Sequence, residues 1–208
     1  MPAEDKEVLE IFSDYVCPWC YLCTVRVARL RAVFAIETVF RHFPLHPETP
    51  NDGLTLEKLF AGREIDCTVA QARMSRLMAA EGLPFGKRTM TYNSRLAQEL
   101  GKWAETQPGG EQLHTALFQA YFVDNLNLSR EENLIAVAEG VGLSLDKARG
   151  VLRERYFRES VDEDWRRSHE LGITGVPTFI MGERCLVGAQ PYGQLESFVT
   201  AAGAVRRP

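Results

Sequence analysis

The stretch SDYVCPWCYLCTVRVARL, residues 13–30, decides the fold prediction, because an apolar run ends there, a helical pattern begins, and three cysteines follow at intervals of three residues. The preceding run VLEIF, residues 8–12, is rich in β-branched and aromatic side chains and predicts a strand that ends before Asp14. From Pro18 onward, apolar residues recur at helical spacing, and proline is favoured at the first helical position because its missing N–H would have no partner there. The stretch therefore predicts a strand-to-helix junction at Cys17.

A second strand and a later hairpin are predicted on either side of a long helical segment. Residues 37–45, ETVFRHFPL, alternate like a strand that prolines then stop, so the beginning of the chain predicts a β-α-β unit. Residues 54–171 show helical periods broken by turn signals and no convincing strand. Two apolar runs in residues 176–189 predict a β-hairpin, and residues 192–201 predict a last amphipathic helix. The predicted fold class is α/β, a small mixed sheet interrupted by an all-helical insertion.

The composition is that of an ordinary globular protein. The 208 residues are 45% hydrophobic and 25% charged with a formal net charge of -4, which gives no electrostatic reason to expect nucleic acid or an anionic membrane as a partner. The first residues, MPAEDKEVLEIF, are acidic where a secretion signal is basic, and no window approaches the roughly 18 apolar residues of a membrane span. We therefore expect a cytoplasmic protein.

Five cysteines in a reducing compartment argue against structural disulfides and favour catalytic or metal-binding thiols. Cys17-Pro18-Trp19-Cys20 is a Cys-x-x-Cys motif whose first sulfur would lie at the positive end of the helix dipole, which stabilises the thiolate that reacts in thiol–disulfide exchange. Cys20 lies one helical turn further along, within disulfide reach, and suits the resolving role. Pro18 and Trp19 are expected to provide backbone rigidity and an apolar rim.

Thr174-Gly175-Val176-Pro177 is the second signal. A proline that opens a strand after a glycine-containing turn is a natural site for a cis peptide bond. If this turn packs opposite Cys17, the backbone of Val176 offers an open edge on which an extended peptide or glutathione could pair. The two motifs together are far more specific than a Cys-x-x-Cys alone.

The sequence resembles the DsbA-like branch of the thioredoxin superfamily, and within it the FrnE-like group, which is related to 2-hydroxychromene-2-carboxylate isomerase and the kappa-class glutathione transferases. The resemblance rests on five stretches that span nearly the whole chain in matching order: SDYVCPWCYL (13–22), FPLHPETP (43–50), YNSRLAQEL (92–100), GITGVPTFIM (172–181) and LVGAQPYGQLESFV (186–199). It implies a thioredoxin-like domain of residues 1–50 and 172–208, and a helical insertion domain of residues 51–171.

The resemblance also implies a redox pair of Cys17 and Cys20, a cis Val176–Pro177 bond, and a protein-disulfide oxidoreductase or isomerase. Its substrates would be protein or small-molecule thiols and disulfides, with glutathione as a candidate co-substrate and no cofactor besides the redox-active disulfide. The substrate-binding residues would be Pro18, Trp19, Val176 and Pro177. The chain differs from similar proteins at Cys23, where a small residue is usual, and at Gln98, where histidine is usual.

Two other functions are compatible with the sequence. One is a glutathione-dependent isomerase or transferase for an aromatic small molecule, although similar isomerases and transferases carry serine where Cys17 stands. The other is a holdase-type binding module with a vestigial disulfide. The oligomeric state and the direction of electron flow stay open.

The remaining polar and sulfur side chains give weaker signals. Cys23 is either a third redox thiol or a buried inert cysteine, and we expect Cys67 and Cys185 to be buried for structural reasons. The cysteine run lacks a fourth iron–sulfur ligand and the histidines are scattered, so no metal is expected. Asp14 is a candidate for tuning the ionisation of the nucleophile, although an ordinary loop acid is the plainer interpretation.

Overall fold

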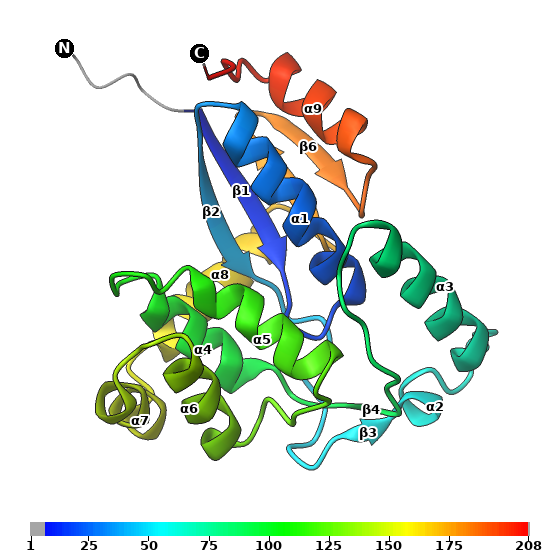
Figure 1. Cartoon of the computed structure of the whole chain (residues 1–208), viewed down its shortest axis with the longest axis vertical. Helices are drawn as coiled ribbons and strands as arrows, with labels where there is room; N and C mark the ends of the chain where they lie inside the picture. Colours follow the sequence, from blue (N-terminus) through cyan, green and yellow to red (C-terminus); the bar gives the residue numbers. More distant parts are fainter. Residues whose placement is uncertain (1–6, 208) are drawn as a thin grey trace.

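The structure, a computed structural model, describes residues 7–207 and contains a four-stranded mixed sheet in the order β2-β1-β5-β6 (Figure 1). The strands are β1 (Glu7–Ser13), β2 (Ile36–His42), β5 (Thr178–Met181) and β6 (Arg184–Val187). Helix α1 (Pro18–Val33) joins β1 to β2, which are parallel, whereas β5 is antiparallel to both β1 and β6. The predicted β-α-β unit, the carboxy-terminal hairpin and the α/β fold class are confirmed.

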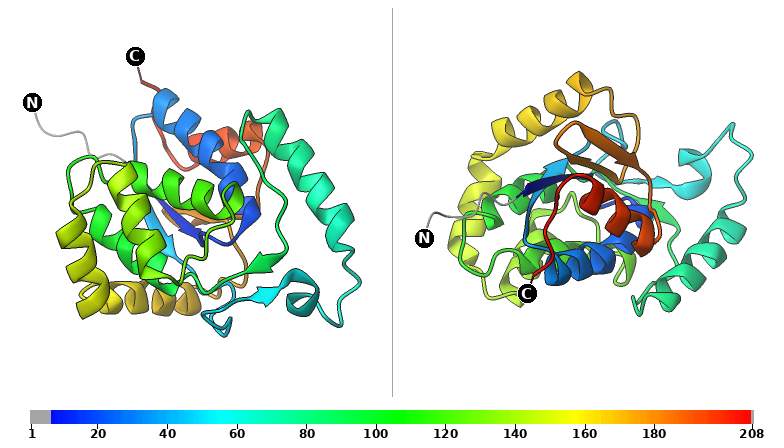
Figure 2. Two further views of the ribbon diagram at one scale, coloured as in Figure 1. Left: turned by 60° about the horizontal axis from the view of Figure 1, so that its bottom comes forward. Right: turned by 90° about the horizontal axis from the view of Figure 1, so that it is seen from above.

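The two faces of the sheet are covered by different helices. Helices α1 and α9 (Tyr192–Ala201) lie on one face, and α8 (Arg158–Glu170) lies on the other (Figure 2). Along β1 the side chains alternate between the faces. Leu9 and Ile11 pack with residues of α1 and α9, whereas Glu10 forms an ion pair with Arg167 of α8.

The segment between β2 and β5 is mainly helical, as predicted. Besides α8 it contains α2 (Leu56–Leu59), α3 (Cys67–Ala80), α4 (Arg95–Ala104), α5 (Gln112–Phe122), α6 (Glu131–Gly140) and α7 (Leu145–Glu154). The prediction that it holds no strand was wrong, because β3 (Leu54–Thr55) pairs with β4 (Met90–Thr91) in a separate antiparallel sheet. Each of these strands has only two residues, too few to produce an alternating pattern.

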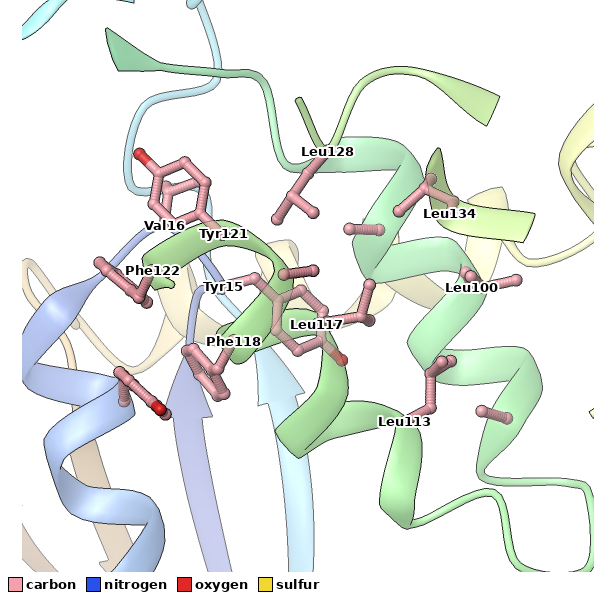
Figure 3. Close-up of a cluster of buried hydrophobic side chains, with 14 of the residues drawn as sticks. Tyr15, Val16, Leu100, Leu113, Leu117, Phe118, Tyr121, Phe122, Leu128 and Leu134 are labelled. Carbon is pink, nitrogen blue, oxygen red and sulfur yellow. The ribbon is translucent and has the colours of Figure 1, made fainter. Parts of the chain in front are cut away.

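Two clusters of buried side chains form the core. The smaller cluster lies between the sheet, α1 and α9 and includes Cys23, Val27 and Leu30. The larger cluster joins the other side of α1 to the insertion, and Figure 3 shows part of it around Tyr15, Phe118 and other buried side chains. Helix α1 contributes side chains to both clusters, so one core is continuous with the other through this helix. The division into a thioredoxin-like domain and an insertion domain stays a prediction. No helix within residues 7–207 is both long and apolar enough to cross a membrane.

Candidate active site

Cys17 is the N-cap residue of α1, at the end of the short loop that follows β1. Its backbone is extended, and its N–H donates to the Asp14 carbonyl at 3.0 Å. Its Sγ accepts a hydrogen bond from the N–H of Cys20 at 3.3 Å, so the sulfur occupies the position that a Ser or Asp side chain takes in an ordinary N-cap. This N–H is one of those that a helix leaves without a backbone partner at its amino terminus. The predicted strand-to-helix junction therefore places the sulfur of Cys17 against the positive end of the helix.

The Val176–Pro177 turn lies directly against Cys17. The register of β1 and β5 pairs Phe12 with Thr178, which brings the residues before β5 beside the loop after β1. The Cys17 thiol contacts the Val176 carbonyl oxygen at 3.5 Å, and the Val176–Pro177 peptide bond is cis. Two segments 159 residues apart in the sequence thus meet at one sulfur atom.

Cys20 and Cys23 follow Cys17 on α1 and lie in different parts of the core. Cys20 is 4% exposed in the larger cluster, and burial, followed by a hydrogen bond with Cys17, raises the pKa of its thiol well above the usual value. Cys23 is 2% exposed in the smaller cluster, and burial raises the pKa of its thiol to about 12. A thiol of this kind is almost entirely protonated at neutral pH, which supports the interpretation of Cys23 as an inert buried cysteine.

The expectation that Cys67 and Cys185 are buried was wrong. Cys185 is exposed on β6, and Cys67 is half-buried at the start of α3. A single sequence shows no partner for either residue, and their exposure depends on how β6 and α3 are placed in the fold. All five cysteines are free thiols in this structure. Within residues 7–207, no group of three or more His, Cys, Asp or Glu side chains is arranged to hold a metal ion.

Asp14 is buried beneath the active-site loop. It is 1% exposed, and its carboxylate accepts hydrogen bonds from the N–H groups of Val16 and Leu45, both at 3.1 Å. Burial raises the pKa of Asp14 to about 6, although hydrogen bonds from Ser94, Val16, Leu45 and Gln98 oppose the shift. The contacts of Asp14 therefore connect the loop before Cys17 to the segment after β2.

A pocket of about 270 Å³ opens beside the active-site motif, between α1, α2, α3 and the segment that precedes β4. Pro18 and Trp19, both predicted as substrate-binding residues, form one of its walls. Val176 contacts the Cys17 sulfur, but neither Val176 nor Pro177 lines the pocket. The other lining residues were missed by the sequence analysis: Leu56, Phe60, Ile65, Cys67, Ala70, Gln71, Arg73, Met74, Phe85 and Arg88.

Arg88 is the most unusual of these residues. It is 7% exposed, and its Nε and Nη1 atoms have no hydrogen-bond partner among the described residues. The guanidinium carbon lies 4.7 Å from the ring centre of Tyr121 and 4.6 Å from that of Phe122, so aromatic faces provide its stabilising contacts. Arg88 precedes β4 in an irregular segment, and no local pattern in the sequence indicates its burial.

Comparisons with known proteins agree with this arrangement. The family described as "DSBA-like thioredoxin domain" matches residues 8–200. Among solved structures, a probable DsbA oxidoreductase, SCO1869 from Streptomyces coelicolor, is 30% identical with a TM-score of 0.86; the match covers 94% of this chain and 89% of that one. The uncharacterized protein YwbO of Bacillus subtilis (strain 168) is 26% identical over 182 residues, which cover 87% of this chain and 90% of YwbO.

A more distant structure shares the fold. The cytosolic disulfide reductase DsbM from Pseudomonas aeruginosa, solved with GSH, is 19% identical with a TM-score of 0.66. The match covers 93% of this chain and 99% of DsbM, so the shared fold extends over nearly the whole of both proteins.

Proposed function

Because this chain belongs to the DsbA-like thioredoxin domain family, we propose that it is a thiol–disulfide oxidoreductase in which Cys17 is the attacking thiol and Cys20 the resolving thiol. The observation that carries the proposal is the position of the Cys17 sulfur, which meets the Cys20 N–H at 3.3 Å and the Val176 carbonyl at 3.5 Å. The first contact gives the sulfur a hydrogen-bond donor from the first turn of the helix. The second places the sulfur beside a backbone segment that a substrate can pair with.

In the reducing direction the reaction begins at Cys17. Its thiolate attacks one sulfur of the substrate disulfide, forms a mixed disulfide, and releases the other substrate sulfur as a thiolate that takes up a proton. Cys20 then loses its proton and attacks the Cys17 sulfur. This forms the Cys17–Cys20 disulfide and releases the second substrate thiol. The oxidising direction is the reverse sequence, and the reduction potential decides which one prevails.

The two cysteines suit these roles for different reasons. Cys17 is at the N-cap, where the sulfur has a hydrogen-bond donor from the helix. The raised pKa of Cys20, caused mainly by burial, keeps that thiol protonated until a mixed disulfide is present. A protonated Cys20 does not compete with Cys17 for the substrate disulfide, because the thiolate and not the thiol is the nucleophile.

Protein or small-molecule disulfides are the proposed substrates, held by Val176 and Pro177, whose turn contacts Cys17, and by Pro18 and Trp19, which line the neighbouring pocket. The Val176 N–H has no backbone hydrogen-bond partner within the described part of the chain, so it is free to pair with an extended substrate. Glutathione is a proposed co-substrate, and the cytoplasm is the proposed location. Both proposals draw support from DsbM, a cytosolic disulfide reductase of the same fold solved with GSH.

Substitution of each cysteine separately tests the proposal. We expect Cys17→Ser to reduce insulin-reduction and thiol-oxidation rates to the uncatalysed level, because no nucleophile remains at the N-cap. We expect Cys20→Ser to accumulate mixed disulfides that mass spectrometry assigns to Cys17, because the resolving step is lost. Cys185→Ser, which removes an exposed thiol on β6, is the matched control and should keep the wild-type rates.

Retention of catalysed exchange by Cys17→Ser would overturn the assignment of the nucleophile. Mixed disulfides on Cys23 in the Cys20→Ser variant would instead assign the redox role to the more deeply placed thiol.

A further inference from the structure

The pocket beside Trp19 combines an apolar wall with a buried cation. Phe60, Ile65, Met74 and Phe85 contribute apolar surface, and the volume of about 270 Å³ is close to the lower end of the range found for small-molecule sites. Pro18 and Trp19 are the two residues between the redox cysteines. Cys17 itself does not line the pocket, but the residue that follows it does, so the pocket begins one residue from the proposed nucleophile.

The charges around the pocket are of one sign. Arg73 and Arg88 line it, and no Asp or Glu side chain of the described residues does. Arg73 is exposed and lies over the Trp19 ring at 5.6 Å, whereas Arg88 is buried. An amphipathic anion, with an apolar body and one negative group, is the ligand that matches such a site.

Arg88 lacks the partner that a buried guanidinium normally has. Buried charges are costly unless they are paired and hydrogen-bonded, and two nitrogens of Arg88 have no partner within residues 7–207. A carboxylate is a suitable partner for a guanidinium, because its charge is of the opposite sign and its oxygens accept hydrogen bonds from N–H groups. The aromatic rings of Tyr121 and Phe122 stabilise the charge, but neither Nε nor Nη1 has a hydrogen-bond partner among the described residues.

We propose that this pocket is the specificity site for small thiols and disulfides that carry a carboxylate on an apolar body, with Arg88 as the group that binds the carboxylate. The proposal rests on the function proposed above, because Cys17 must react with the sulfur of the bound molecule. Trp19 and the apolar wall hold the body of the substrate, and Arg88 selects its charge.

A pair of disulfide reagents tests this proposal on the reduced protein. Dithiobis(nitrobenzoate) carries a carboxylate on each ring, whereas dithiodipyridine is an aromatic disulfide without charge at neutral pH. In both cases the Cys17 thiolate displaces one aromatic thiolate, and Cys20 then loses its proton, closes the Cys17–Cys20 disulfide and displaces the second. The nitrothiobenzoate product stays a thiolate, whereas the pyridine product takes up a proton to become a thione; both products absorb light. The rates are measured by stopped-flow absorbance in a Cys67→Ser, Cys185→Ser background, because these partly or fully exposed thiols would also react. Cys67 lines the pocket, so every variant is compared with this background and not with the wild type.

We expect Arg88→Met to slow the reaction with dithiobis(nitrobenzoate) by about tenfold or more, the equivalent of a charge-assisted hydrogen bond, and to leave the dithiodipyridine rate within about twofold. Arg76→Gln is the matched control, since it removes the same charge from an exposed position on α3 that does not line the pocket. It should leave the ratio of the two rates unchanged. Arg88→Lys, which keeps the charge without the planar donor pair, should give an intermediate ratio.

Equal slowing with both reagents would overturn the proposal. It would mean that Arg88 acts on the Cys17 thiolate, which lies close enough to interact with the charge of Arg88, and not on the substrate. Unchanged rates with both reagents in Arg88→Met would likewise overturn it.

A binding measurement separates failure of the pocket from failure of the redox mechanism. Calorimetry with naphthoate and its uncharged analogue naphthamide on the Cys17→Ser variant needs no reactive thiol. Naphthoate binding that is at least about tenfold tighter than naphthamide binding, and that is lost in the Arg88→Met, Cys17→Ser variant, supports the site even if Cys17 proves not to be the nucleophile. Equal binding of the two compounds, or no binding of either, would overturn the site whatever the redox result.

Discussion

Glu10 and Asp14 lie four positions apart, one within β1 and the other in the loop that follows it, and both carboxylates are largely buried. Glu10 accepts hydrogen bonds from Arg41 and Arg167, each at 2.9 Å. Asp14 accepts bonds from two backbone N–H groups, and no cation pairs with it among the described residues. Two acids in one short segment therefore differ in their surroundings: Glu10 is paired with cations, and Asp14 is held by backbone hydrogen bonds.

The difference extends to the regions around them. Behind the sheet, Glu10, Arg41, Lys102, Asp164 and Arg167 form what we call the ion-pair cluster, in which each charge meets an opposite one. Burial acts to raise the pKa of Glu10, but the hydrogen bonds and charges of Arg167 and Arg41 outweigh it and lower that pKa below its usual value.

Beside the redox cysteines the charges are left unpaired. Burial raises the pKa of Asp14 to about 6, and Arg88 has no carboxylate partner in the described part of the chain. The fold thus uses paired charges to hold α8 and α4 against the sheet, and keeps unpaired ones where chemistry is proposed to occur. Perturbed ionisable groups of this kind are enriched at functional sites.

The largest effect is expected from breaking the ion-pair cluster. Asp164 is 1% exposed and holds Arg41 at 3.1 Å, Lys102 at 2.8 Å and the His42 N–H at 3.0 Å. Asp164→Ala leaves these partners without their carboxylate. We expect it to lower the free energy of unfolding by about 3–5 kcal/mol, as measured by urea melts.

The control for this variant lies on the same helix. The side chain of Asp162 is 49% exposed and pairs with Arg95. Asp162→Ala should lower the free energy of unfolding by less than about 1 kcal/mol. Similar losses for Asp164→Ala and Asp162→Ala would show that the cluster contributes no more than surface ion pairs, and the contrast between the two regions would disappear.

Asp14 gives a smaller effect that depends on pH. Its folded pKa of about 6 exceeds the ordinary value of 3.8, so the folded state binds the proton more tightly and its stability falls as pH rises from about 4 through 6. Asp14→Asn removes this titration. We expect the variant to gain up to about 3 kcal/mol relative to the wild type between pH 4 and pH 8, at about 1.4 kcal/mol per pKa unit.

The measurement for Asp14 is a series of urea melts of both proteins across that pH range. A constant difference between wild type and Asp14→Asn would mean that Asp14 titrates normally, and a difference that moves in the other direction would place a cation beside it.

Glu10 should give the smallest effect, with the opposite sign. Its lowered folded pKa means that its contribution is present above the ordinary value near 4.5 and is lost as pH falls through the lower folded value. We expect Glu10→Gln to cost about 1–2 kcal/mol at pH 7, and the cost to shrink in acid. Thermal unfolding of both proteins at pH 7 and pH 3 measures it, and a cost that grows in acid would contradict the assigned pairing.

Much of the fold could be predicted because its signals are local. The Cys-x-x-Cys motif, the proline at the first turn of α1 and the alternation in β1 each depend on neighbouring residues only. The last helix was predicted over residues 192–201, the same bounds that the structure gives for α9. The contact between Cys17 and Val176 is long-range, and it was expected because the Cys-x-x-Cys motif and the Gly-Val-Pro turn occur together in the sequence.

The parts that could not be predicted depend on tertiary placement. A spacing of three residues separates Cys20 and Cys23 by about 60° around a helix, and whether they share one environment depends on what packs on each side. The structure places them in different clusters. The sequence likewise identified Asp14 as a candidate but not whether a cation meets it, and nothing near Arg88 signals that an irregular segment buries a guanidinium.

Helix α1 has consequences for protein engineering. Tyr21 and Leu22 face the insertion, with the Tyr21 hydroxyl bonded to the Pro84 carbonyl at 3.1 Å, while Val27 and Leu30 face the sheet. A chimera that transplants the insertion onto another scaffold must carry the outward side of this helix with it. If the insertion were transferred alone, its apolar side chains would lack the α1 residues that they pack against here. The α1 helix left behind would in turn expose its apolar side chains, such as Tyr21 and Leu22.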